Sequence, residues 1–80
     1  MKYQGGYQII DLSGEDIFAK AKSAFETNKP VLVYDEGIAS FGNVTKDSNN
    51  FVISYIINDK LYKSTIAEDN TVTKTTINLG

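Results

Sequence analysis

After Pro30, the only proline, the chain alternates between β-rich runs and short turn clusters, and this alternation constrains the fold more than any other feature. The clusters "DEG", "KDSNN", "ND" and "EDN" hold residues that favour turns, and strand-forming residues flank each of them. Connections this short join antiparallel neighbours, because a parallel pair needs a crossover of about a dozen residues. The sequence therefore predicts a meander of strands over residues 31–34, 38–44, 51–57, 60–67 and 71–79.

The predicted strands differ in how their side chains are distributed. The run from Val31 to Tyr34 is dense in β-branched and aromatic residues, as in a strand covered on both faces. Between Phe51 and Ile57, alternate apolar residues share one face, which indicates a central strand beneath a helix. The run 71–77 is mostly Thr and Lys, the composition of a solvated face or an edge strand. Gly42 lies inside a predicted strand, where a bulge or a close contact is the usual cause.

A short strand from Tyr7 to Leu12 and then a helix precede Pro30. Ser13 followed by Asp16 has the spacing of a capping box, and Leu12 with Ile17 has that of a hydrophobic staple. These signals predict that the helix begins near residue 14.

The end of the helix is marked twice. Asn28 can adopt the left-handed conformation that ends a helix, and Pro30 forces Lys29 toward an extended geometry. We therefore predict a helix from about Gly14 to Asn28, with its apolar residues at helical spacing.

The expected architecture is a single α+β domain over residues 1–80, in which residues 1–6 form a flexible lead-in. One N-terminal helix packs on a mostly antiparallel meander sheet of five or six strands. We expect the core to include Ile9, Leu12, Ile17, Phe18, Phe25, Leu32, Val33, Ile53, Tyr55 and Ile66.

The composition excludes several classes of function. The chain has no Cys, His or Arg, which removes disulfides, thiolate metal sites and most catalytic constellations. Its eight Lys residues are scattered and the net charge is -2, so we expect no nucleic-acid partner. There is no signal peptide in this chain and no run near the ~20 apolar residues of a membrane span, so we expect no membrane insertion. We expect no enzymatic activity, cofactor or metal.

Asp35-Glu36 is the closest approach to a catalytic carboxylate pair. Consecutive residues of a strand or turn point in different directions, whereas hydrolysis of glycosides needs two carboxyls that face each other. We therefore interpret the pair, with Gly37, as the bend between two strands. Asp47 with Asn49 resembles the start of a calcium loop, but the glycine and the distal glutamate of such loops are missing.

Tyrosines are the best candidates for a binding surface, because they are enriched where proteins contact partners. We expect Tyr7, Tyr34 and Tyr55 to be half-buried in the core. The candidate interaction surface is formed by residues of the lead-in and of the last two strands: Tyr3, Tyr62, Lys60, Lys63, Thr73 and Thr75.

Two segments carry a resemblance to a known group of proteins. The helix and strand in Ala19 to Asp35, which include "KPVLVYD", and the "DNTVT" element in Asp69 to Thr73 resemble small modules of phage and prophage tail-fibre, baseplate and neighbouring hypothetical proteins from gut bacteria. The resemblance implies a virion setting, or the cytoplasm of the bacterial host, and a homo-oligomer, either trimer or dimer. The shared motifs are structural, so no functional residue is carried over.

These observations favour a non-enzymatic structural or interaction module associated with a phage virion. The alternative is a small soluble protein that binds a bacterial surface protein or glycan through exposed Tyr residues and a sheet edge. A carboxylate-dependent hydrolase that uses Asp35 and Glu36 is the third hypothesis, and the missing acid–base groups disfavour it.

Overall fold

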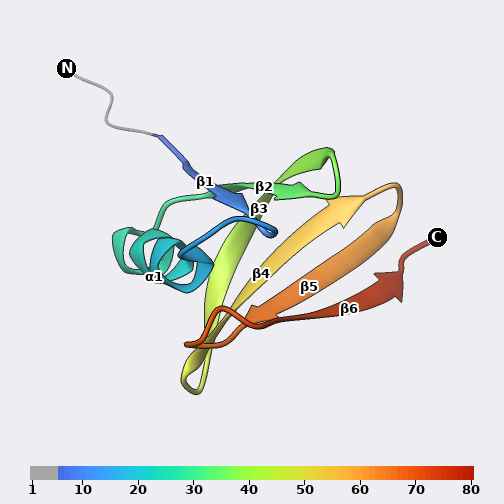
Figure 1. The fold of residues 1–80 in the computed structure, drawn as a ribbon. Helices are drawn as coiled ribbons and strands as arrows, with labels where there is room; N and C mark the ends of the chain where they lie inside the picture. Colours follow the sequence, from blue (N-terminus) through green and yellow to red (C-terminus); the bar gives the residue numbers. More distant parts are fainter. Residues whose placement is uncertain (1–5) are drawn as a thin grey trace.

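Residues 6–80 are described by a computed structural model, which contains one helix and a six-stranded sheet (Figure 1). The elements are β1 (Gln8–Asp11), α1 (Ile17–Thr27), β2 (Val31–Asp35), β3 (Ile38–Asp47), β4 (Asn50–Ile57), β5 (Lys60–Ile66) and β6 (Val72–Asn78). The predicted α+β class is confirmed. The predicted flexible lead-in, apart from Gly6, lies outside the described residues.

The strands lie in the sheet in the same order as in the chain, from β1 to β6. β1 and β2 are parallel, and α1 is the crossover between them; every other neighbouring pair is antiparallel. β6 lies at one edge, in agreement with its Thr-rich composition, and β1 lies at the other. At 11 residues α1 is too short to span a bilayer, and residues 6–80 contain no other helix that could.

Two-residue turns join β2 to β3, β3 to β4 and β4 to β5, whereas residues 67–71 join β5 to β6. Glu36 and Gly37 have φ of 53° and 82°, and Asn58 and Asp59 have φ of 51° and 63°. Positive φ at both central positions is the geometry that matches the twist of a hairpin. The interpretation of Asp35-Glu36-Gly37 as a bend between strands is confirmed.

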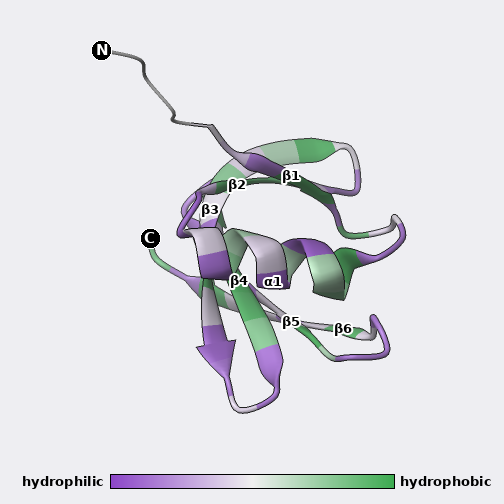
Figure 2. Ribbon diagram, turned by 90° about the vertical axis from the view of Figure 1, so that its left-hand side faces the viewer, coloured by the Kyte–Doolittle hydropathy of each residue, from purple (hydrophilic) through white to green (hydrophobic). Residues whose placement is uncertain are grey.

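The core lies between α1 and one face of the sheet, which we call the helix-covered face. Figure 2 shows α1 flanked by β1 and β2 above and by β5 and β6 below, so the sheet curves around the helix. Phe18 and Phe25 of α1 pack on Phe51, with ring centroids 5.2 and 5.5 Å apart. The buried apolar residues are Ile10, Ile17, Ala21, Ala24, Val31, Val33, Phe51, Ile53, Tyr55 and Ile66.

Three of the predicted core residues do not belong to the core. Ile9 is 48% exposed and Phe25 is 40% exposed, while Leu32 is only half-buried. Ile9 and Leu32 lie on the face of the sheet away from α1, because successive strand residues alternate between faces and Ile10 takes the inward position. The expectation that residues 31–34 are covered on both faces was wrong for the same reason. The other predicted core residues are buried or packed against the core.

α1 begins at Ile17, later than the predicted Gly14. Ser13 does not cap it, because its backbone N–H and its hydroxyl both donate to Asp11 Oδ1, at 3.0 and 2.9 Å. These hydrogen bonds, the backbone one first, hold the pKa of Asp11 below its usual value. The helix ends as predicted, with Asn28 in the left-handed conformation.

A side chain that is distant in the sequence accepts a hydrogen bond from a backbone N–H at the start of α1. Asn70, in the β5–β6 turn, accepts a 3.0 Å hydrogen bond from the N–H of Phe18 at its Oδ1. This bond replaces the local cap that we expected from Ser13, and it ties α1 to the far side of the sheet.

We expect Asn70→Gly to lower the free energy of unfolding by about 1 kcal/mol, the usual worth of a helix cap. Asn70 has a φ of 71°, which glycine adopts freely, so this substitution removes the cap without straining the turn. Urea denaturation measures the change. Asn70→Asp keeps an acceptor oxygen and serves as the control that should retain stability. Equal stability of the glycine variant and the wild type would show that the bond contributes nothing.

Candidate functional site

A polar cluster on the helix-covered face links β2 to β6. The ammonium of Lys74 lies 2.8 Å from Asp35 Oδ2 and donates to Asp35 Oδ1 at 3.0 Å. Three strands separate β2 from β6 in the sheet, so the curvature of the sheet brings these two side chains together. The side chain of Asp35 is only 11% exposed and that of Lys74 is 33% exposed, so the ion pair is partly shielded from water. Asp35 is therefore both part of the bend between β2 and β3 and a partner in the ion pair that joins β2 to β6, which we call the Asp35–Lys74 clasp.

Tyr55 and Ser64 complete this cluster, which we call the Asp35 cluster. The hydroxyl of Tyr55 donates to Asp35 Oδ2 at 2.9 Å and lies 3.0 Å from Ser64 Oγ. Tyr62 stacks on Tyr55, with ring centroids 5.4 Å apart and an interplanar angle of 5°. Within residues 6–80, every buried side-chain nitrogen or oxygen has a hydrogen-bond partner. The Asp35 cluster thus has the features of a structural tie, because its groups are already engaged with one another.

The electrostatics of the Asp35 cluster also favour fixed protonation states. Burial, and then the hydrogen bond and charge of Asp35, raise the pKa of Tyr55 to about 12. The hydrogen bond with Asp35 raises the pKa of Lys74 above its usual value. A phenol and an ammonium with raised pKa values hold their protons at neutral pH. They are therefore poorly suited to act as a general base or a nucleophile.

We expect stability to fall as the pH rises from about 10 to 12, because Tyr55 keeps its proton when folded and loses it when unfolded. Lys74 contributes in the same direction, since its folded pKa is also raised and its stabilisation is lost at high pH. Urea denaturation at several pH values measures this slope. Tyr55→Phe should make the slope shallower, and Tyr7→Phe, which alters an exposed ring, should not. An unchanged slope in the Tyr55 variant would contradict the assignment.

The other face of the sheet, which we call the open face, carries an apolar row that crosses all the strands. Within β1–β3 and within β4–β6, each member of the row is the register partner of the next. Phe41 of β3 and Ile56 of β4 join the two halves. They lie at the same level of the sheet, because Phe41 precedes Gly42, Ile56 follows Tyr55, and Gly42 and Tyr55 are register partners. The row consists of Ile9, Leu32, Phe41, Ile56, Leu61 and Ile77.

Most of the apolar row is accessible to solvent. Phe41 is 61% exposed, Ile56 is 57% exposed, and the end members Ile9 and Ile77 are 48% and 45% exposed. Phe41, Ile56 and Leu61 line a shallow hollow of about 230 Å³. A continuous apolar band of this kind is unusual on a surface that faces only water, and it is typical of an interaction site.

Two tyrosines border the apolar row. Tyr7 is 50% exposed and Tyr34 is 41% exposed, although we expected both to be half-buried in the core. The ring of Tyr7 meets that of Phe41 edge-on, with centroids 5.5 Å apart. The third tyrosine expected in the core, Tyr55, is buried. Tyr7 and Tyr34 are exposed because they follow the alternation that turns Ile9 and Leu32 outward.

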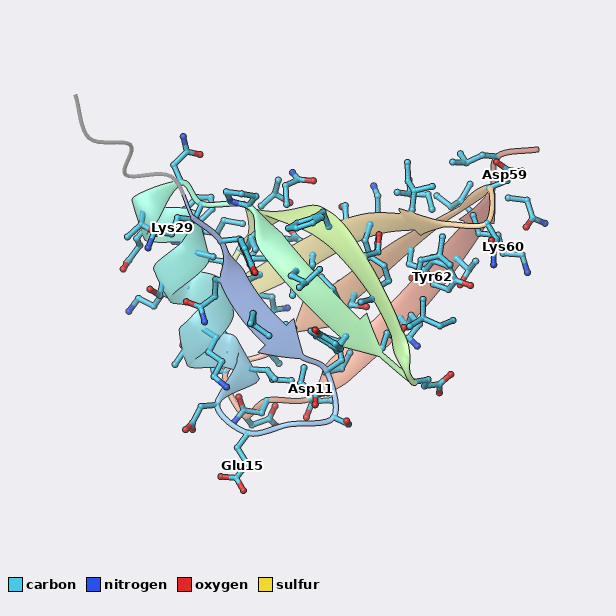
Figure 3. The ribbon with its side chains drawn as sticks, turned by 90° about the horizontal axis from the view of Figure 1, so that it is seen from above. Asp11, Glu15, Lys29, Asp59, Lys60 and Tyr62 are labelled. Carbon is cyan, nitrogen blue, oxygen red and sulfur yellow. The ribbon has the colours of Figure 1, made fainter. Side chains whose placement is uncertain are left out.

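The predicted interaction surface is divided between the two faces of the sheet. Lys63 and Thr75 are register partners, and Thr73 follows on the same open face. Lys60 and Tyr62 lie on the helix-covered face, where Figure 3 shows them at the end of the sheet that holds the β4–β5 turn. Their positions follow from strand alternation, which separates even from odd residues of β5. Tyr3 lies outside the described residues.

Comparisons of this chain with models of protein families, with curated proteins and with solved structures found no match. The resemblance to phage tail-fibre and baseplate modules therefore gains no support from relatives. The assignment of the candidate site therefore depends on the geometry of the open face.

Proposed function

We propose that this chain is a non-enzymatic interaction module that binds its partner through the open face of the sheet. The observation that carries the proposal is the apolar row, which crosses the sheet and leaves Phe41 and Ile56 more than half exposed. Burial of such side chains against a partner is the main source of affinity in protein interfaces.

The surroundings of the apolar row support this proposal. The next row on the open face is polar and mostly uncharged, with Asn43, Ser54, Lys63 and Thr75 at matching levels. An apolar centre with a polar rim is the usual anatomy of a protein interface. The Asp35 cluster, on the opposite face, contributes stability in this proposal and takes no part in binding.

The setting that we propose is a phage or prophage virion, with the cytoplasm of the bacterial host as the alternative. This part of the proposal is supported by the resemblance of Ala19 to Asp35 and of Asp69 to Thr73 alone. A structural role in a virion is compatible with the proposed binding mode, because virion proteins function through contacts with other chains.

A second candidate function is the binding of a glycan on a bacterial surface. The exposure of Tyr7 and Tyr34 beside the apolar row favours it, since tyrosine rings combine an apolar surface with a polar tip. A glycan would contact the same open face, so the two candidates differ in the partner and share the site.

The test compares the wild type with a double variant, Phe41→Ser and Ile56→Ser, that removes the centre of the apolar row. Immobilised protein is exposed to lysate from a bacterial host and, separately, to a glycan array. We expect reproducible retention by the wild type, at least tenfold weaker retention by the double variant, and no change for the control Thr45→Ala, which alters the same face outside the row. Equal retention by all three proteins would contradict the assignment of the open face.

A further inference from the structure

We propose that β6 is a pairing edge, through which two copies of this chain join β6 to β6 in antiparallel register and form one continuous sheet. This inference concerns the edge of the sheet and is independent of the binding role proposed for the open face. It rests on three properties of β6: its length and regularity, the position of its only charged side chain, and its remaining side chains.

The two edges of the sheet differ in how accessible they are to another strand. β1 has 4 residues, and edge strands this short are poor templates for pairing. β6 has 7 residues and pairs with β5 without interruption from Val72 to Asn78, with no proline and no bulge. Among residues 6–80 no strand pairs with the outer side of β6, so its outward N–H and C=O groups are available.

The residue that normally protects such an edge is engaged elsewhere. Lysines on edge strands discourage pairing with other chains, and Lys74 is the only charged residue of β6. Its ammonium lies 2.8 Å from Asp35 Oδ2, on the helix-covered face, so it is held across the sheet toward β2. This ion pair leaves the edge without a free charge.

The remaining side chains of β6 suit a strand with a neighbour on both sides. Val72, Ile77 and the Thr residues are β-branched, and such residues pack well against cross-strand neighbours. The side chain of Ile77 is 45% exposed in the single chain. A partner strand would cover part of its surface.

Two identical edges allow one register of greatest overlap, which is centred on Thr75, the middle residue of Val72–Asn78. In this register Thr75 lies opposite its own counterpart, and Thr73 lies opposite the partner's Ile77. Lys74 lies opposite the partner's Thr76, so the two ammonium groups are not directly opposed. The contact is two-fold symmetric and closes as a dimer.

The test measures the mass of the full chain by sedimentation equilibrium from micromolar to near-millimolar concentrations. We expect the wild type to approach the mass of a dimer. Thr75→Lys should raise the dissociation constant at least tenfold, because two ammonium groups then face each other at the centre of the pair. Thr75→Glu should do the same, and an equimolar mixture of the two variants should form heterodimers, because opposite charges then meet.

Matched controls separate this inference from the proposed function. Thr45→Lys adds the same charge to β3, inside the sheet, and should leave the dimer intact. The double variant Phe41→Ser and Ile56→Ser should also dimerise, since it alters the open face only. A wild type that is monomeric at every concentration, a dimer that tolerates Thr75→Lys, or a mixture that fails to form heterodimers would each overturn the pairing of β6 and leave the role of the open face untouched.

Discussion

Replacing Gly42 by Ala should destabilise the protein by about 3 kcal/mol or more, because the added methyl group meets backbone. A Cβ atom built at Gly42 would lie 2.2 Å from the carbonyl oxygen of Ser54, in the neighbouring strand β4. The oxygen belongs to the ladder that joins β3 to β4, so it cannot move without disturbing the centre of the sheet. Urea denaturation gives the change in the free energy of unfolding.

Gly6→Ala is the matched control for this substitution. Apart from its chain neighbours, no heavy atom of the described residues 6–80 lies within 4 Å of a Cβ built at Gly6, so the same chemical change there should leave stability within about 0.5 kcal/mol of the wild type. A folded Gly42→Ala protein with wild-type stability would mean that β3 and β4 do not approach as closely as described.

Replacing Asp35 by Ala should lower the free energy of unfolding by about 1–3 kcal/mol, since it leaves Lys74 without its partner and Tyr55 with one hydrogen bond fewer. The side chain of Lys74 is 33% exposed, and water therefore compensates for part of the lost ion pair. Thermal or urea denaturation at neutral pH measures the loss.

A double-mutant cycle isolates the ion pair from the hydrogen bond. Lys74→Met removes the charge and keeps the length of the side chain, and the cycle with Asp35→Ala should show a coupling of about 1 kcal/mol. Asp35→Asn retains an acceptor for the hydroxyl of Tyr55 and should cost less than the alanine substitution. Strict additivity of Asp35→Ala and Lys74→Met would contradict the clasp between β2 and β6.

Features determined by nearby residues could be predicted from the sequence. The turns of the meander follow from Asp, Asn and Gly at positions that need positive φ, and Asn28 with Pro30 ends the helix. The close approach at Gly42 was indicated by a glycine inside a predicted strand. Each of these depends on the chemistry of a few consecutive residues.

Features that depend on residues far apart in the chain could not be predicted from the sequence. The start of α1 depends on Asn70, whose side chain lies 52 positions from Phe18 in the chain. The Asp35–Lys74 clasp depends on the curvature of the sheet, which no local pattern records. Ionic partners at such separations become apparent only once the strands are in register.

The apolar row was missed because alternation alone does not say which face of a strand is covered. Ile9 and Ile10 are adjacent and chemically identical, yet only Ile10 is buried. The signal that was present is the apolar residue at a matching level of every strand, which the turn lengths would have revealed if the register had been worked out.

The central claim is that the open face is uncovered and available to a partner, and hydroxyl-radical footprinting of the dilute protein tests it most directly. Three of the 4 phenylalanines form an internal scale, with Phe41 at 61% exposure, Phe25 at 40% and Phe51 at 4%. We predict that Phe41 is oxidised fastest, Phe25 more slowly and Phe51 least. Protection of Phe41 to the level of Phe51 would contradict the claim, because it would mean that the apolar row is buried within the isolated chain.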